Sequence, residues 1–269
     1  MPNYNYAKYL KKRIKSILRQ TYPIYEFIIL DDCSTDDSDK IISESIKGTK
    51  IKYIKNEKNS GKAILQWKKG FELAKGDYVW IAEADDLSNK HFLEEAMKGF
   101  LDKDVVLSYT ESMVINGKGL MLAPNFRWSR DKEKSGHFKK SYIKSGEDEI
   151  KEIMAIRCTI PNVSAVVFKN DKKILGLLDE AAKFKQVGDW YLYLKILEGG
   201  KISYNHKACN KFRIHGGSVT RKSRENRSHF DEIRQLHKML KKQYDLDEKI
   251  IGFMDVEEMR VSIEHGIIK

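Results

Sequence analysis

Up to Tyr109, segments in which apolar residues recur at helical spacing alternate with short continuous apolar runs. Side chains at three- and four-residue spacing, such as Leu10, Ile14 and Ile17, predict helices, and short apolar runs between them predict strands. The predicted helices cover residues 7–20, 38–46, 64–74 and 92–100, and the predicted strands cover 27–30, 51–54, 78–82 and 105–109. Alternation of this kind is typical of an α/β fold with a mostly parallel sheet and helices on both faces.

The pattern weakens in the segment 111–152, which is rich in Gly, Lys and Ser and contains the aromatic residues Phe126 and Trp128. Long irregular segments in compact domains often form lids or binding loops, and we predict such a loop here. Order returns with a predicted strand over 163–168 and a predicted helix over 189–197.

The last part of the chain carries a helical stripe of apolar residues. Ile233, Leu236, Leu240 and Tyr244 predict an amphipathic helix beyond about Arg224. Such a helix could pack on the domain, mediate oligomers or lie on a membrane surface, and packing is the commonest use. We therefore expect one domain over 1–223, with halves 1–109 and 110–223, and a helical extension over 224–269.

Composition narrows the class of protein without choosing a function. In 269 residues, 33% are charged and 41% are hydrophobic, which is typical of a globular chain. No apolar run approaches the roughly 18 residues that span a bilayer, and the N-terminus lacks a signal-peptide core, so we expect a cytoplasmic protein. Three cysteines without metal-like spacing indicate reduced thiols. A net charge of +11 favours anionic partners but does not choose among phosphorylated ligands, acidic lipids and nucleic acid.

Acidic residues gather where two predicted strands end. The strand over 78–82 runs into Glu83-Ala84-Asp85-Asp86, and the strand over 27–30 runs into Asp31-Asp32. Crowded carboxylates repel one another unless they share a cation, and ligands of open α/β sheets bind outside the carboxyl ends of the strands. The alternative is helix capping, which we favour for Asp36, Ser38 and Ser88. For Asp32, Glu83 and Asp85 we favour a functional site that holds a metal ion.

Several spaced motifs together resemble the family 2 glycosyltransferases. The resemblance covers residues 2–220 and rests on Pro2-Asn3-Tyr4-Asn5, Asp31-Asp32-Cys33-Ser34-Thr35-Asp36, Asn59-Ser60-Gly61, Gly76-Asp77-Tyr78 before the acidic cluster, Gly188-Asp189-Trp190, and Arg213-Ile214-His215-Gly216-Gly217-Ser218. It implies a GT-A fold, a nucleotide-diphosphate sugar donor, a divalent cation such as Mn²⁺ or Mg²⁺, and inversion at the anomeric carbon. Residues 1–109 would then form the nucleotide-sugar half, and residues 110–223 the acceptor and catalytic half.

The resemblance also implies roles for individual residues. It implies that Asp189 is the catalytic base, that Asp85 and Glu83 occupy the acidic metal-binding positions, and that His215 contacts the diphosphate or the metal. The residues implied at the nucleotide sugar are Pro2, Tyr4, Asp32, Lys62, Glu83, Asp85 and Asp86. The residues alone leave alternatives open, because Asp189 could be a helix cap and His215 a structural histidine. Other basic residues that could reach phosphate are Arg213 and Arg221.

The chain departs from the family pattern in two places. The family has a buried strand before the Pro-x-Tyr-Asn turn, whereas this sequence starts at Met1 without it. We therefore expect either a sheet with a truncated first strand or a reading that begins inside a longer gene. Glu83 stands where Asp is more usual, and its longer side chain could still bind ribose or metal.

The predicted function is a metal-dependent inverting glycosyltransferase, with a UDP-sugar as the default donor. The acceptor would be a hydroxyl of a glycan or of a lipid-linked or protein-linked acceptor, used in the synthesis of bacterial surface polysaccharide or glycoprotein glycans. The chain could contact the inner face of the membrane peripherally, and an oligomer is compatible with the sequence. One alternative is a degenerate GT-A domain that binds polyanions or glycans, or serves assembly. Another is a sugar-phosphate nucleotidyltransferase, although its glycine-rich triphosphate loop has no good candidate near the N-terminus. Nucleic acid is not an expected partner.

Overall fold

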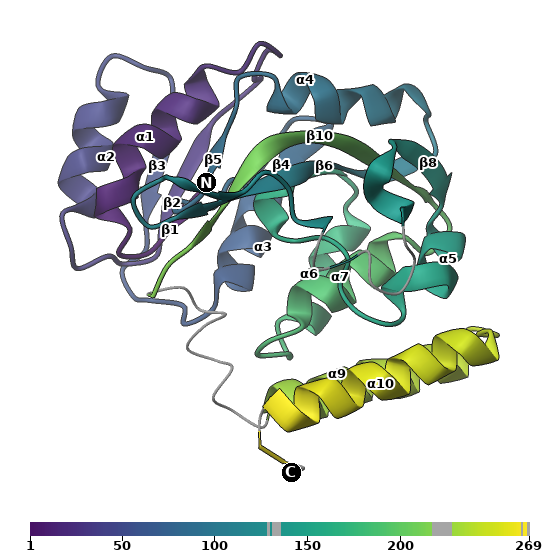
Figure 1. Cartoon of the computed structure of the whole chain (residues 1–269). Coiled ribbons are helices and arrows are strands. Elements are labelled where there is room, and N and C mark those ends of the chain that lie inside the picture. Colours follow the sequence, from purple (N-terminus) through teal and green to yellow (C-terminus); the bar gives the residue numbers. More distant parts are fainter. Residues whose placement is uncertain (128–129, 131–135, 217–227, 265, 268–269) are drawn as a thin grey trace.

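The computed structural model describes residues 1–127, 130, 136–216, 228–264 and 266–267. It contains two β-sheets with helices packed against them (Figure 1). One sheet has three strands in the order β1-β2-β3. The other has seven, with β4-β9-β6-β10-β5 in a row and β7 and β8 paired to β6 and β10. The predicted α/β fold with a mostly parallel sheet flanked by helices is confirmed.

The three-stranded sheet is wholly parallel and belongs to the first 55 residues. Its elements are β1 (Pro2–Asn3), α1 (Ala7–Leu18), β2 (Ile28–Asp31), α2 (Ser38–Ile46) and β3 (Lys52–Lys55). In α1 the apolar side chains Leu10, Ile14 and Ile17 are almost fully buried and pack with Ile29 of β2. The helix therefore forms where its period of 3.6 residues directs one apolar stripe at the sheet.

The seven-stranded sheet is built around two long strands. Its strands are β4 (Tyr78–Trp80), β5 (Leu87–Ser88), β6 (Val105–Asn116), β7 (Met121–Ala123), β8 (Tyr142–Ser145), β9 (Val166–Lys169) and β10 (Lys201–Ile214). The strands β6 and β10 run parallel over almost their whole length, and the shorter strands pair with their neighbours in antiparallel directions.

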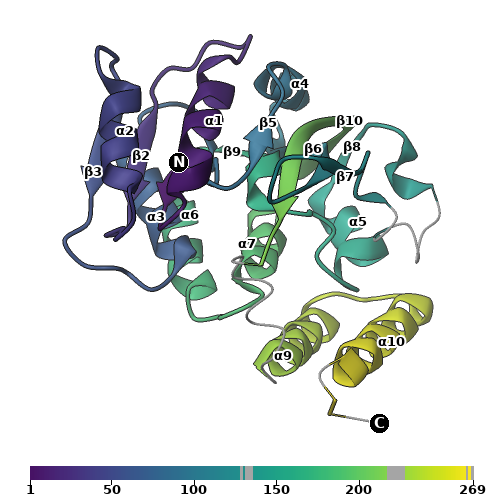
Figure 2. The same cartoon turned by 60° about the vertical axis from the view of Figure 1, so that its left-hand side comes forward.

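Helices cover both faces of this sheet. On one face lies α4 (Phe92–Met97) with the short 3-10 turn Lys98–Leu101, and Figures 1 and 2 show α3 (Ala63–Leu73), α6 (Lys173–Ala181) and α7 (Gly188–Ile196) on the other. The turn after α4 approaches closely because it contains Gly99. A Cβ there would lie 2.4 Å from the hydroxyl of Ser203 and 2.6 Å from that of Ser108, so only glycine fits.

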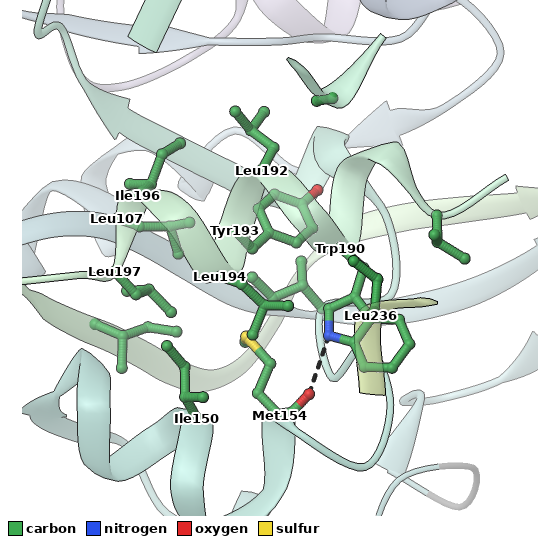
Figure 3. Close-up of a cluster of buried hydrophobic side chains, with 14 of the residues drawn as sticks. Leu107, Ile150, Met154, Trp190, Leu192, Tyr193, Leu194, Ile196, Leu197 and Leu236 are labelled. Atoms are coloured by element: carbon green, nitrogen blue, oxygen red, sulfur yellow. Dashed lines mark hydrogen bonds between the residues drawn. The ribbon is translucent and has the colours of Figure 1, made fainter. Parts of the chain in front are cut away.

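The largest core lies under α7 and reaches the C-terminal helices. Figure 3 shows Trp190 of α7 donating its indole N–H to the carbonyl of Met154 at 3.0 Å, beside Leu194 and Leu236. Leu236 belongs to α9 (Ser228–Gln243), which lies beside α10 (Glu248–Glu264) in both overall views. Of the predicted uses of the extension, packing on the domain is therefore the one seen in the structure.

Several elements differ from the sequence expectations. The segment 111–152 is not irregular throughout, because β6 continues to Asn116 and is followed by β7, β8 and α5 (Gly146–Glu149). The elements β10, α6 and α10 were not predicted. In β10, Lys, Asn and His interrupt the apolar period, and register shifts between Asn205 and Asn210 break the alternation further. Trp128 lies outside the described residues.

Candidate active site at two acidic strand ends

Helix α3 brings the two acidic strand ends together. Gln66 donates to a carboxylate oxygen of Asp32 at 2.9 Å, and the next residue, Trp67, donates its indole N–H to Glu83 at 2.6 Å. One helix thus contacts the ends of β2 and β4, which lie in different sheets. The expectation that both ends meet at one crevice agrees with this geometry.

Asp31 organises the turn after β2. Its buried carboxylate accepts hydrogen bonds from the backbone N–H and the hydroxyl of Ser34, at 2.8 and 2.7 Å, and from the amide of Asn3 at 2.6 Å. Asn5 closes the same turn, because its side-chain oxygen accepts from the backbone N–H of Thr35 at 2.8 Å. Asn5 and Cys33 adopt positive φ angles of 57° and 62°, which non-glycine residues rarely do. The turn is therefore held by many bonds.

Asp32 is equally well bonded. Its carboxylate accepts from the amide of Asn56 at 2.7 Å, from the backbone N–H and hydroxyl of Ser60 at 2.9 and 2.7 Å, and from Gln66. The side chain is 4% exposed. In this arrangement Asp32 fixes the 56–60 loop, and its implied approach to a nucleotide base stays a prediction.

At the end of β4, Asp85 and His215 form a pair. The Nε2 atom of His215 lies 3.0 Å from a carboxylate oxygen of Asp85, whose side chain is 16% exposed. Tyr6 and Tyr9 of the α1 region pack against the imidazole, with ring centroids 5.7 and 5.4 Å away. The predicted metal-binding residues Asp85 and His215, which are 130 positions apart, are thus within hydrogen-bonding distance.

Asp86 faces the interior instead. One carboxylate oxygen accepts the backbone N–H of Arg213 at 2.8 Å, and the other accepts the amide of Asn162 at 2.5 Å. The guanidinium of Arg213 also donates to the backbone carbonyls of Asp85 and Asn116, at 2.5 and 2.9 Å. These bonds attach β10 to the acidic cluster just before His215. Asp86 is 3% exposed, and in this structure it joins the acidic cluster to Arg213 and Asn162. Its implied contact with the nucleotide stays a prediction.

Burial and neighbouring carboxylates raise the pKa of two of the acids, Glu83 and Asp86. Burial first, and then the charge of Asp85, raise the pKa of Glu83 to about 8 and that of Asp86 to about 7. Arg13 of α1 supplies the opposing charge from below, although its own burial lowers its pKa to about 10. Its guanidinium is fully buried over the ring of Trp80, and its Nε and Nη1 atoms have no hydrogen-bond partner. The sequence analysis did not identify Arg13, which looks like any other basic residue on a helix.

The residues present fit a divalent cation held jointly by protein and donor. Asp85 and His215 offer an oxygen and a nitrogen ligand from one place, whereas the carboxylate of Glu83 is directed to Trp67. Within the described ranges, no group of three His, Cys, Asp or Glu side chains is placed to hold a metal ion. Mg²⁺ is often held by one or two protein ligands together with substrate phosphates. A diphosphate would therefore have to supply part of the coordination.

Asp189 lies in the first turn of α7. Gly188 before it packs so closely that a Cβ would lie 2.6 Å from the carbonyl oxygen of Ala181. Burial raises the pKa of Asp189. The backbone N–H of Trp190 donates to the Asp189 carboxylate at 2.8 Å, and this hydrogen bond acts in the opposite direction, lowering the pKa. Burial raises the pKa of the Tyr193 phenol, and the charges of Asp189 and Glu83 raise it further. Asp189 and Glu83 therefore both act electrostatically on one buried side chain, that of Tyr193.

A residue of α9 holds the turn before Asp189. The carboxylate of Glu232 accepts the backbone N–H groups of Lys185, Gln186 and Val187 at 2.8, 2.8 and 3.3 Å. The sequence analysis did not anticipate this role for the extension. Only the folded chain reveals it, because the partners are at least 45 positions apart.

The remaining predicted residues are placed less directly. Lys62 donates its ammonium group to the carbonyl of Ala182, so it joins the start of α3 to the loop after α6 in this structure. Pro2 is buried in β1, and Tyr4, which is 45% exposed, follows it at the edge of the turn. Gly217, Ser218 and Arg221 lie outside the described residues.

The fold is that of GT-A glycosyltransferases. S. aureus TarS 1-349 in complex with UDP-GlcNAc superposes with a TM-score of 0.66 at 19% identity, over 100% of this chain and 72% of that one. The mannosyltransferase PcManGT from Pyrobaculum calidifontis, in complex with GDP-Man and Mn²⁺, gives a TM-score of 0.63 at 16% identity, over 98% of this chain and 70% of that one. These likenesses show the shared fold.

The family follows from the sequence match. The family model for glycosyl transferase family 2 matches residues 1–154, more than half of the chain, and the chain belongs to this family. The putative teichuronic acid biosynthesis glycosyltransferase TuaG of Bacillus subtilis is 34% identical over 110 residues, 40% of this chain and 43% of that protein. Chondroitin synthase of Pasteurella multocida is 25% identical over 97% of this chain and 25% of that protein. The chain thus spans less than half the length of these two relatives.

Proposed function

We propose that this chain transfers a sugar from a nucleotide-diphosphate sugar, a UDP-sugar by default, to an acceptor hydroxyl with inversion at the anomeric carbon. The observation that carries the proposal is the Asp85–His215 pair at the end of β4. The names of the relatives, which act in teichuronic acid and chondroitin synthesis, support an acceptor in polysaccharide synthesis.

The donor would bind between the two acidic strand ends. The turn held by Asp31 and Asp32, with Pro2 and Tyr4, would line the nucleotide pocket, and the diphosphate would lie toward Asp85 and His215. A divalent cation held by this pair would neutralise the charge that develops on the leaving diphosphate. We propose Mn²⁺ or Mg²⁺, because the pair combines a carboxylate with an imidazole, a donor set that suits Mn²⁺ as well.

Asp189 would act as the general base. Its carboxylate accepts the proton of the acceptor hydroxyl while that oxygen forms a bond to the anomeric carbon, and the bond from this carbon to the diphosphate oxygen breaks on the opposite face. One base is sufficient, since the diphosphate leaves with the bonding electrons and needs no acid. The raised pKa of Asp189 makes it a better proton acceptor than an ordinary aspartate.

The alternatives are less well supported. A non-catalytic polyanion-binding or assembly module would have no use for a carboxylate such as that of Asp85 left partly exposed at a strand end, because carboxylates repel phosphate unless a cation intervenes. A nucleotidyltransferase is not among the relatives described above. Among the described residues no helix is both long and apolar enough to cross a membrane. The proposal places transfer in the cytoplasm, where a lipid-linked acceptor would bring the chain to the inner face of the membrane.

The proposal is tested with the purified chain and a panel of UDP, GDP, dTDP and CMP sugars, each with Mn²⁺ or with EDTA. A donor that binds the folded state raises the melting temperature by mass action, so no acceptor is needed. We expect one nucleotide class to stabilise the chain only when Mn²⁺ is present. Salt-sensitive binding of polyanions that persists in EDTA, together with no response to any donor, would instead favour the binding module.

Single variants then separate the two proposed roles. Asp189→Asn should lower transfer by about 10²–10⁴-fold, the usual contribution of a general base, while donor-induced stabilisation is retained. Transfer by Asp189→Asn at the wild-type rate would show that the base is another residue. Asp179→Asn on the exposed side of α6 is the matched control, since it removes a surface carboxylate that pairs with Lys68.

A further inference from the structure

The hairpin formed by β6 and β7 ends in an apolar stretch that is exposed to water. Leu120, Met121 and Leu122 are 63%, 59% and 59% exposed, and we call these three residues the hairpin tip. Single exposed apolar residues are ordinary on a protein surface, whereas several large ones together mark an interaction site. The hairpin tip is therefore a candidate interaction surface.

The apolar side chains lie on both faces of the hairpin. Asn116 of β6 donates its backbone N–H to Leu120 at 2.9 Å, and Ile115 lies opposite Met121. Successive side chains of a strand point to opposite faces, so Leu120 and Met121 lie on opposite faces. Figure 2 shows β7 beside β6, its pairing partner. A folded protein would cover one face of such a projection, whereas a fluid apolar phase surrounds both. This geometry favours a lipid surface.

The turn that carries the tip is held by its own hydrogen bonds. The side-chain oxygen of Asn116 accepts the backbone N–H groups of Lys118 and Leu120, at 2.9 and 3.0 Å. Gly119 donates its N–H to the carbonyl of Asn116 at 2.9 Å and adopts a φ angle of 88°, which favours glycine. A projection that is already ordered loses little conformational entropy when it binds.

The base of the hairpin contacts the proposed cation site. Arg213 donates to the backbone carbonyls of Asp85 and Asn116, at 2.5 and 2.9 Å. A Cβ at Gly117 would lie 3.6 Å from the Cβ of His215. The end of the tip is five residues beyond Gly117, at most roughly 18 Å away even in an extended chain. A surface that binds the tip would therefore lie close to the Asp85–His215 pair.

The charges near the tip suit an anionic surface. Residues 112–127 contain no Asp or Glu, and their charged side chains are Lys118 and Arg127. Arg127 lies 3.9 Å from the buried carboxylate of Glu111, whereas Lys118 is exposed in the turn beside the tip. A lysine close to an anionic membrane strengthens binding roughly fivefold. The net charge of +11 acts in the same direction.

We propose that the hairpin tip inserts into an anionic phospholipid surface, with its apolar side chains below the headgroups and Lys118 at their level. The strength of such a contact depends on the apolar area that enters the lipid and on attraction to anionic headgroups. The attachment does not depend on the sugar-transfer proposal. Its consequence rests on that proposal, because the site would then face acceptors that are carried by lipid.

The test measures sedimentation of the full chain with vesicles of phosphatidylcholine, either alone or mixed equally with phosphatidylglycerol. We expect binding to the mixed vesicles to be at least about fivefold tighter. The hairpin variant combines Leu120→Gln, Met121→Gln and Leu122→Gln. It should bind at least about 100-fold more weakly, because each large apolar side chain that enters an apolar phase contributes roughly tenfold. Lys118→Gln should weaken binding severalfold, and only to the mixed vesicles.

Helix α10 provides a matched control. Val256, Met259 and Ile263 follow one face of this helix and are 62%, 59% and 56% exposed. The α10 variant replaces all three by Gln, so it removes as many apolar side chains at similar exposure. Its vesicle binding should stay within about twofold of wild type, since the two sites are independent. Both variants should melt with the wild-type chain, because exposed substitutions change stability little.

Three results would overturn the inference. One is a wild-type chain that binds neither kind of vesicle, and a dimer in light scattering that the hairpin variant lacks would then identify a second copy as the partner. Another is unchanged vesicle binding by the hairpin variant. The third is an equal loss in the α10 variant. A chain that binds no vesicle but is stabilised by a nucleotide sugar would leave the sugar-transfer proposal in place.

Discussion

Two neighbouring acid pairs, Asp31-Asp32 after β2 and Asp85-Asp86 after β4, have the same composition and the same place in the fold, but different surroundings. At the first pair both carboxylates are buried and accept several hydrogen bonds from nearby loops. At the second, Asp86 is bonded in the same manner, whereas Asp85 stays partly exposed beside His215.

This difference in hydrogen bonding and exposure distinguishes acids that hold the fold from acids that are available to a ligand. A carboxylate whose oxygens accept several protein donors is stabilised as a structural acceptor and is less available to a ligand. Asp85 has an imidazole as its side-chain partner, and a histidine can exchange that contact for a metal ion. We therefore expect the functional residue of each pair to be the one for which the protein supplies fewer hydrogen-bond donors.

The largest expected effect is at the exposed member of the second pair. Asp85→Asn should lower transfer by about 10³-fold, or roughly 4 kcal/mol, because the ligand that would hold the cation at the diphosphate loses its charge. Donor binding in Mn²⁺, measured by calorimetry, should weaken as well. Asp31→Asn serves as the control, and its transfer per folded molecule should stay within about tenfold of wild type. Similar losses in both variants would remove the distinction between the pairs.

The next effect concerns stability. Asp86→Ala leaves the backbone N–H of Arg213 and the amide of Asn162 without their buried acceptor. At about 1–3 kcal/mol for each of the two unsatisfied groups, we expect the free energy of unfolding in urea to fall by about 2–6 kcal/mol. A variant with unchanged stability that has lost only donor binding would place Asp86 at the nucleotide instead.

A smaller loss is expected where a second acceptor remains nearby. Glu232→Gln keeps one oxygen for the N–H groups of the 185–187 turn but removes the charge, so stability should fall by about 1 kcal/mol. Transfer should fall severalfold with donor binding unchanged, because this turn leads into Asp189. Unchanged transfer would show that the turn does not position the base.

The smallest effect is a displacement of the pH profile. Burial raises the pKa of Asp189 above the usual value for aspartate of about 3.9, and the base acts only when ionised. The transfer rate of wild-type protein should therefore decrease, as pH falls, at a higher pH than an ordinary aspartate would give. The logarithm of kcat/KM against pH measures this limb, and a profile that stays flat down to pH of about 4 would contradict the assignment.

Much of the fold could be predicted from local pattern. The predicted helix over 38–46 has the same bounds as α2, and the others agree closely, because an apolar stripe that repeats every turn is itself the reason the helix forms. The strand β10 could not be predicted in this way. Its Lys, His and Asn residues do not form an apolar period, and it is a strand because β6, β8 and β5 supply partners far away in the sequence.

The site divides in the same manner. The motifs pointed to Asp85, His215 and Asp189, whose roles stay predictions. They contained no sign of Arg13, whose guanidinium is buried over the ring of Trp80, or of Glu232, which holds the turn before α7. Charged residues on amphipathic helices are common, and only packing distinguishes a buried counter-charge from a solvated one.

The sequence by itself determined the order of helices and strands near the N-terminus, the family, and the residue types at the acidic strand ends, because these depend on local period and on motifs. Only the tertiary structure decided which acid of each pair is held by several protein donors and which stays accessible. The physical reason is that burial, hydrogen-bond partners and cavities are properties of segments that meet in space, and no single segment encodes them.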